Sequence, residues 1–115
     1  MFLYNDRGQM IAQNIIFANT FMKRFKGLMG TTDEQFGYYC AMVFDKCKSI
    51  HTCFMEFPLD ILYLDKKFNL IGISLDVQPW RMDNGPKKSY YCIELKAGTL
   101  SGQEKQVFLR YSILE

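Results

Sequence analysis

The chain has 115 residues, of which 49% are hydrophobic and 16% aromatic. This composition is not typical of a disordered chain, and the length is sufficient for one domain over residues 1–115 with its own hydrophobic core. Its net charge of +2 comes from scattered basic residues, and this pattern lacks the concentrated basic face that nucleic-acid binding needs. No apolar run approaches the roughly 20 residues that cross a bilayer, and the first residues lack a secretory signal, so we expect a cytoplasmic protein with reduced cysteines and no membrane span.

The N-terminal third predicts a hairpin followed by a helix. Residues 2–4 and 9–17 flank the turn Asn5-Asp6-Arg7-Gly8, which favours two paired strands. From residue 19 the apolar period becomes helical, with Asn19 or Thr20 as N-cap and Gly30 as terminator. The apolar residues on one face of this helix would be Phe21, Phe25, Leu28 and Met29.

The remainder predicts short strands. They span residues 41–44, 49–57, 60–65, 68–77, 89–95 and 107–113, with Pro58 breaking the chain between the second and third. Residues 97–102 predict a single helical turn or a tight loop. We therefore expect an α+β fold with a mostly antiparallel or mixed sheet curled into a partial barrel, one clear helix and one possible short helix.

Three segments carry a resemblance to a known family. They are Arg24-Phe25-Lys26-Gly27-Leu28-Met29, then His51-Thr52-Cys53-Phe54-Met55 with Pro58-Leu59-Asp60-Ile61-Leu62-Tyr63-Leu64-Asp65, and finally Glu94-Leu95-Lys96-Ala97-Gly98. Their order and spacing resemble the prokaryotic family called domain of unknown function 192, over nearly the whole chain. The resemblance implies a compact, barrel-like α+β domain without an established reaction or ligand. Similar short members are associated with pilus or secretion gene sets, which implies a protein or peptide partner of such a system.

The chain also departs from the family pattern. Cys53 stands where the family usually has an aromatic or apolar residue, and Glu56 where it usually has a basic or polar one. The tail at residues 99–105 is shorter than the usual helix and turn. These departures fall on positions with which relatives build surface properties, so such properties do not carry over to this chain.

Candidate ligand-binding residues lie in the same segments. His51, the only histidine, could be a base or a ligand, or a hydrogen-bonded core residue. Asp60 and Glu94 could converge with it if the sheet curls. Arg24 and Thr52 complete the candidate group. The group would support acid–base chemistry of a hydrolase, or equally a structural cluster in which carboxylates accept backbone N–H bonds and pair with arginine.

A zinc site is a further alternative. Cys40, Cys47, His51 and Cys53 lie within fourteen positions. Their spacing does not match the paired C-x-x-C units of structural zinc sites, so four buried thiols are the competing interpretation. We predict no cofactor.

The segment at residues 78–88 is the best candidate for contact with another molecule. It holds two prolines, one glycine and the only tryptophan, Trp80, next to Arg81. Trp and Arg are favoured in protein interfaces, and the alternative is that Trp80 folds back as a lid over an open end of the barrel. Since no nucleophile signature, phosphate-binding glycine loop or cofactor fingerprint is present, we favour a small non-enzymatic binding or assembly module with a cleft near His51, Asp60 and Glu94.

Overall fold

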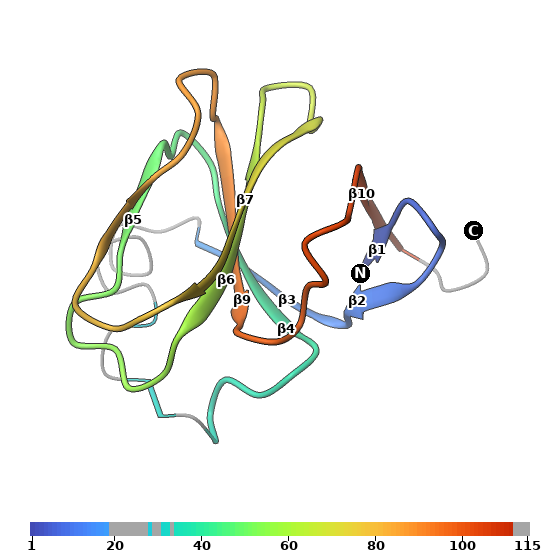
Figure 1. Ribbon diagram of the computed structural model, residues 1–115. Helices are drawn as coiled ribbons and strands as arrows, with labels where there is room; N and C mark the ends of the chain where they lie inside the picture. The colour runs from blue at the N-terminus through green and yellow to red at the C-terminus, as the bar shows by residue number, and fades with distance from the viewer. Residues whose placement is uncertain (19–27, 29–30, 33, 112–115) are drawn as a thin grey trace.

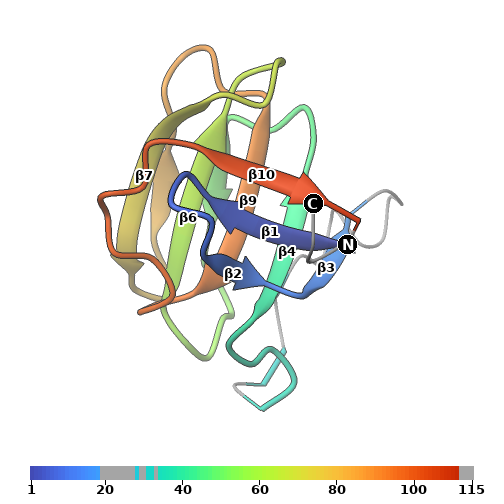
Figure 2. The same cartoon turned by 90° about the vertical axis from the view of Figure 1, so that its right-hand side faces the viewer.

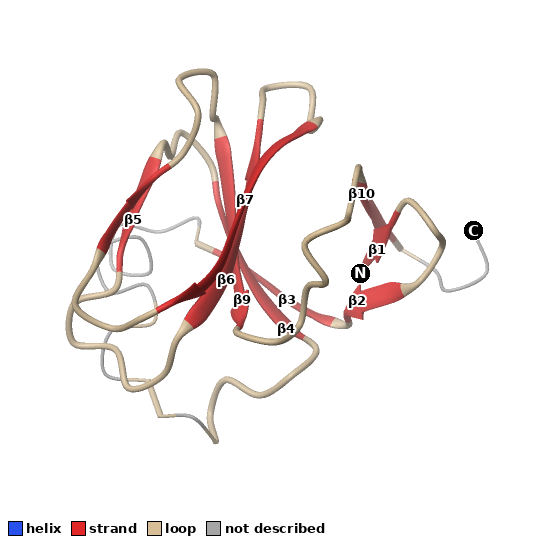
Figure 3. Cartoon of the chain, viewed as in Figure 1, coloured by secondary structure: helices blue, strands red, loops and turns tan. Residues whose placement is uncertain are grey.

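The computed structural model describes residues 1–18, 28, 31–32 and 34–111, and every regular element in those residues is a β-strand (Figure 3). The strands are β1 (Phe2–Asn5), β2 (Met10–Ala12), β3 (Asn14–Phe17), β4 (Cys40–Phe44), β5 (Ser49–His51), β6 (Leu59–Leu64), β7 (Leu70–Val77), β8 (Met82–Asn84), β9 (Tyr91–Lys96) and β10 (Val107–Arg110).

These strands form three sheets. The central sheet has five strands in the order β3-β4-β9-β6-β7, antiparallel except for the parallel pair β3–β4. A three-stranded sheet, β10-β1-β2, lies to its right in Figure 1, and the two-stranded ribbon β5–β8 lies to its left. Figure 2 shows the three-stranded sheet crossing in front of the central strands. The central sheet is therefore covered on both faces.

Burial of the central strands explains this layering. All six residues of β6 are buried, as are the middle four of β9. Ile61 and Tyr63 join one core cluster with Phe36, Met55 and Phe57. Leu62 and Leu64 of β6 join a second cluster with residues of the three-stranded sheet, which are Leu3, Ile11, Ala12 and Val107. A strand that is apolar on both faces needs a packing layer on each face. A single sheet that closes on itself buries only its inner face.

The expected α+β class and the expected partial barrel are both wrong. Within the described residues the regular structure is all β, and the sheets stay open as three separate units. The helix expected from residue 19 lies outside those residues except for Leu28, which is buried in the first core cluster. Residues 97–102 form a turn, the second of the two predicted alternatives. The described residues also contain no helix long and apolar enough to cross a bilayer.

Two segments near the middle of the chain differ from expectation. The strand predicted over 49–57 ends at His51, and the predicted long loop contains β8, which pairs with β5. Gly85, after β8, permits this arrangement because a Cβ there would lie 2.2 Å from the ring of Tyr63. Close approach to a buried aromatic side chain is therefore the reason for glycine at this position.

Candidate functional site

The strand register separates the two predicted carboxylates. Asp60 stands opposite Leu95 across the β6–β9 pair, and Ile61 stands opposite Glu94. Because opposed residues of paired strands point to the same face and successive residues alternate, Asp60 and Glu94 lie on opposite faces of the central sheet. His51 is exposed at the end of β5, in the separate ribbon. Arg24 lies outside the described residues.

Asp60 binds backbone amides on two other segments. Its carboxylate is 1% exposed. Oδ1 accepts the N–H of Asp76 at 2.9 Å, and Oδ2 accepts the N–H groups of Gly98 and Leu100, both at 3.0 Å. With three N–H donors on its two oxygens, the carboxylate fixes the turn after β9 and the end of β7. This arrangement is the structural alternative given above for that residue.

Glu94 is a buried carboxyl group in the central strand β9. Its side chain is 3% exposed, and Oε1 has no hydrogen-bond partner within the part of the chain that the structure describes. Burial, followed by the nearby Cys47 side chain, raises the pKa of Glu94 to about 8. Since an apolar environment disfavours the charged form, the group is mostly protonated at neutral pH. A perturbed carboxyl marks a candidate functional position, although this one is closed to solvent.

Thr52 joins the two loops that flank the β5–β8 ribbon. Its buried hydroxyl donates to the carbonyl of Gln78 at 2.6 Å and accepts the N–H of Arg81 at 2.8 Å. Its backbone N–H donates to the carbonyl of Arg81, and its carbonyl accepts the N–H of Trp80. These bonds stop the strand at His51 because the backbone of residue 52 pairs with a loop. We call residues 52–55 and 78–82 together the aromatic tip.

The aromatic tip exposes two rings that contact each other. Phe54 is 60% exposed and Trp80 58% exposed, with ring centroids 4.6 Å apart. Both residues have positive φ, 63° and 64°, a conformation that costs side-chain-bearing residues free energy and concentrates at functional positions. Met82, 64% exposed, extends the apolar surface beside His51, its partner in the strand pair. Trp80 therefore does not cover an open end of the sheet.

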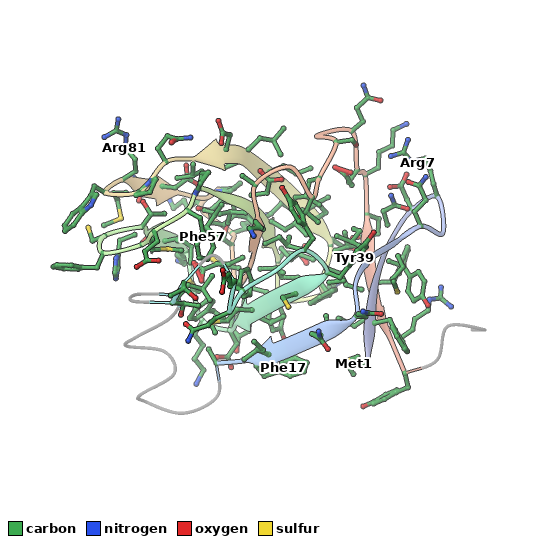
Figure 4. All side chains as sticks on the ribbon, turned by 90° about the horizontal axis from the view of Figure 1, so that it is seen from below. Met1, Arg7, Phe17, Tyr39, Phe57 and Arg81 are labelled. Carbon is green, nitrogen blue, oxygen red and sulfur yellow. The ribbon has the colours of Figure 1, made fainter. Side chains whose placement is uncertain are left out.

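A tyrosine of the core ties the ribbon to the central sheet. The hydroxyl of Tyr63 in β6 donates to the Asp83 side chain at 2.5 Å and lies 3.1 Å from the Asp83 carbonyl. Burial and the adjacent carboxylate raise the pKa of Tyr63. The β5–β8 ribbon is thus attached to the central sheet through Asp83, the middle residue of β8. Figure 4 shows Arg81 and Arg7 towards opposite ends of the molecule.

The candidate zinc ligands do not form a metal site. Among the described residues, no group of three or more His, Cys, Asp or Glu side chains could hold a metal ion. Cys47 Sγ lies 3.3 Å from the carbonyl of Ser49, while Cys40 Sγ lies 3.8 Å from the side-chain nitrogen of Asn14. Only Cys92 of the four cysteines is buried, so the competing expectation of four buried thiols is also wrong.

Phe54 is a surface residue that the sequence pattern does not reveal, since that pattern places it on a strand over residues 49–57 with no assigned role. The signal is weak, because an apolar residue in an apolar run is indistinguishable from a core residue until the strand is known to end at His51. Met82 lies in the segment at residues 78–88, which the sequence already indicates for contact with another molecule. Trp80 and Arg81 were found because the composition of residues 78–88 is unusual.

Comparison with known proteins places the chain in a family. Residues 3–106 match the sequence model of DUF192, described as an uncharacterized ACR. A UPF0127 protein of Thermococcus sibiricus is 26% identical over 102 residues, which are 87% of this chain and 66% of the relative. The chain thus spans just under two thirds of that relative's length. A UPF0127 protein of Pyrococcus furiosus is 24% identical over 102 residues, 88% of this chain and 87% of the relative.

A solved structure shows the same fold. A candidate transcription regulator from Sinorhizobium meliloti superposes with a TM-score of 0.75 over 93% of this chain and 89% of its own. At 20% identity this likeness extends to the fold alone. The family match spans nearly the whole chain and agrees with the motifs at residues 51–65 and 94–98. The chain is therefore a member of the uncharacterised family DUF192.

Proposed function

We propose that this chain is a small non-enzymatic binding module that contacts a protein partner through the aromatic tip. The observation that carries the proposal is the exposed Phe54–Trp80 pair, held in left-handed backbone conformations by the Thr52 hydrogen bonds. The exposed rings add little to the stability of the domain, and the backbone conformations oppose it by about 1–3 kcal/mol each. A binding role explains why a folded domain retains both.

The chemistry of the tip suits an apolar pocket on another protein. Trp and Arg are the residues that most often carry binding energy at protein interfaces, and Trp80 and Arg81 are adjacent and exposed. The Thr52 bonds order both loops before binding, which lowers the entropic cost of association. Met82 adds a flexible apolar side chain at the rim. Pilus or secretion proteins are the first partners to examine.

The hydrolase alternative receives no support from the described residues. It requires His51, Asp60 and Glu94 to converge on one cleft. The register puts the carboxylates on opposite faces, and the oxygens of Asp60 are occupied by backbone N–H groups.

Replacing both rings should abolish binding without unfolding the domain. We expect Phe54→Ala with Trp80→Ala to change the free energy of unfolding by less than about 1.5 kcal/mol, since the pair is exposed. Affinity for the partner should fall by about 30-fold or more, the effect of losing a central aromatic residue. Thermal denaturation followed by circular dichroism measures the first quantity. Photo-crosslinking from position 80 identifies the partner, and calorimetric titration with the purified partner measures the second.

A matched control comes from β10 and the residue that follows it. Phe108 and Tyr111 are exposed aromatic residues outside the tip, so Phe108→Ala with Tyr111→Ala removes two exposed rings as well. This variant should keep its affinity. Equal loss of binding by the two variants, or unfolding of the tip variant alone, would contradict the proposal.

A further inference from the structure

Three lysine-bearing segments meet at one end of the central sheet. Lys66 and Lys67 occupy the turn between β6 and β7, and Lys87 and Lys88 the turn before β9. Lys48 follows β4. The strands β4, β9 and β6 are consecutive neighbours in the sheet and antiparallel, so the end of β4, the start of β9 and the end of β6 coincide. The three segments lie together at the top of Figures 1 and 2.

These lysines line one cavity. It has a volume of about 510 Å³, which falls within the range of small-ligand pockets. Among the described residues, its wall includes Lys48, Lys66, Lys67, Lys87 and Lys88, with Asp65 as the single acidic residue. Five lysines against one aspartate leave a formal charge of +4 on the lining side chains. Positive charge concentrated in a concave surface attracts anions, and an ammonium group is a common phosphate ligand.

The oxygens of the Asp65 carboxylate accept hydrogen bonds within the turn that carries Lys66 and Lys67. Its Oδ1 accepts the backbone N–H groups of Lys67 and Asn69 at 2.9 Å, and its Oδ2 accepts the Asn69 side chain at 3.3 Å. These bonds, led by the backbone N–H of Asn69, lower the pKa of Asp65. The carboxylate therefore stabilises the turn that presents Lys66 and Lys67.

The cavity also contains a polar group without a partner and an aromatic wall. Ser89 is 3% exposed, and its hydroxyl has no hydrogen-bond partner within the described part of the chain. A buried hydroxyl without a hydrogen-bond partner lowers the stability of the folded state. Such groups are rare in folded proteins, and a bound ligand would explain this one. Tyr90 lines the same cavity, with the ammonium of Lys66 5.6 Å from its ring centroid. Cations, a hydroxyl donor and an aromatic ring thus adjoin in one concave site.

We propose that this cavity binds a small, multiply phosphorylated ligand. A formal charge of +4 exceeds what a single carboxylate would balance and matches a chain of phosphate groups. The basic lining is confined to nine residues of three chain segments, which favours a small molecule over a polymer, whose phosphates would need an extended basic stripe. The ring of Tyr90 offers a surface for an uncharged part of the ligand. This site is separate from the aromatic tip and does not depend on its role.

Calorimetric titration with inorganic tripolyphosphate tests the site. At physiological salt we expect one-to-one binding in the micromolar range to the intact chain. Lys66→Gln with Lys87→Gln should weaken binding by about tenfold, because it removes two of the five cations. Arg7→Gln with Lys105→Gln removes the same charge outside the cavity, next to the turn that contains Asp6, and should change binding by less than about twofold because solvent ions screen distant charges. Circular dichroism should show that both variants remain folded.

A vesicle-binding experiment distinguishes a small phosphorylated molecule from the phosphate groups of a lipid surface. The chain is sedimented with phosphatidylcholine vesicles, with and without phosphatidylglycerol. We expect no sedimentation that depends on Lys66 and Lys87. Vesicle binding that depends on these lysines, without tripolyphosphate binding, would overturn the small ligand in favour of a membrane surface. Absence of tripolyphosphate binding, or equal losses in the two charge variants, would overturn the site itself.

Discussion

Asp60→Ala is expected to lower the free energy of unfolding by about 4 kcal/mol, because it leaves three backbone N–H groups without their acceptor. Hydrogen bonds to an ionised carboxylate are stronger than neutral ones, and this carboxylate is buried. Urea denaturation at neutral pH measures the loss. Hydrogen exchange should locate it first at the amides of Gly98 and Leu100.

Two further variants serve as comparisons for Asp60→Ala. Asp60→Asn keeps one acceptor oxygen but directs an NH₂ group towards a donor, so it should lose roughly half as much stability. Glu56→Ala removes an exposed carboxylate and should stay within about 0.5 kcal/mol of the original chain. A loss below about 1 kcal/mol for Asp60→Ala would show that the three bonds do not hold the turn.

Glu94→Gln is expected to stabilise the protein at alkaline pH. The pKa of Glu94 is about 8 in the folded chain, against an ordinary value of 4.5, so folding binds a proton between these two pH values. The unfolded state binds fewer protons there, and stability therefore falls as the pH rises from 4.5 to 8 and levels off above 8. Glutamine is never ionised, so the variant lacks this decline. Its advantage above pH 8 should approach an upper limit of about 5 kcal/mol.

The pH dependence separates this effect from simple repacking. Near pH 4 the two proteins should differ by no more than about 1 kcal/mol, since both then carry an uncharged side chain. Glu104 supplies a control of opposite sign. Burial alone would raise the pKa of Glu104, but the hydrogen bonds from Ser101 and Gly102 lower it below its ordinary value. The ionised carboxylate therefore stabilises the folded chain above pH 4.5, and Glu104→Gln should be less stable than the original chain in that range. Urea denaturation across this pH range gives both curves. A Glu94 variant whose advantage does not grow with pH would show that the carboxyl is not buried uncharged.

The candidate site was only partly predictable. Trp80 and Arg81 were identified from composition, and the structure shows Trp80 exposed. Asp60 and Glu94 were expected to converge, yet one residue of register decides which face a side chain occupies. The lysine cavity was not expected, because Lys48, Lys66 and Lys87 look scattered along the chain. Only the strand order brings them together.

The sequence by itself determined the family, the position of most strands and the turns between them. These are local properties, carried by motifs such as residues 51–65, by apolar runs and by turns such as Asp65-Lys66-Lys67. Tertiary structure alone decided that β6 and β9 are buried on both faces, that three open sheets replace a barrel, and that Phe54 meets Trp80 outside the core. These outcomes depend on pairings between segments far apart in the chain, and no local pattern specifies such pairings.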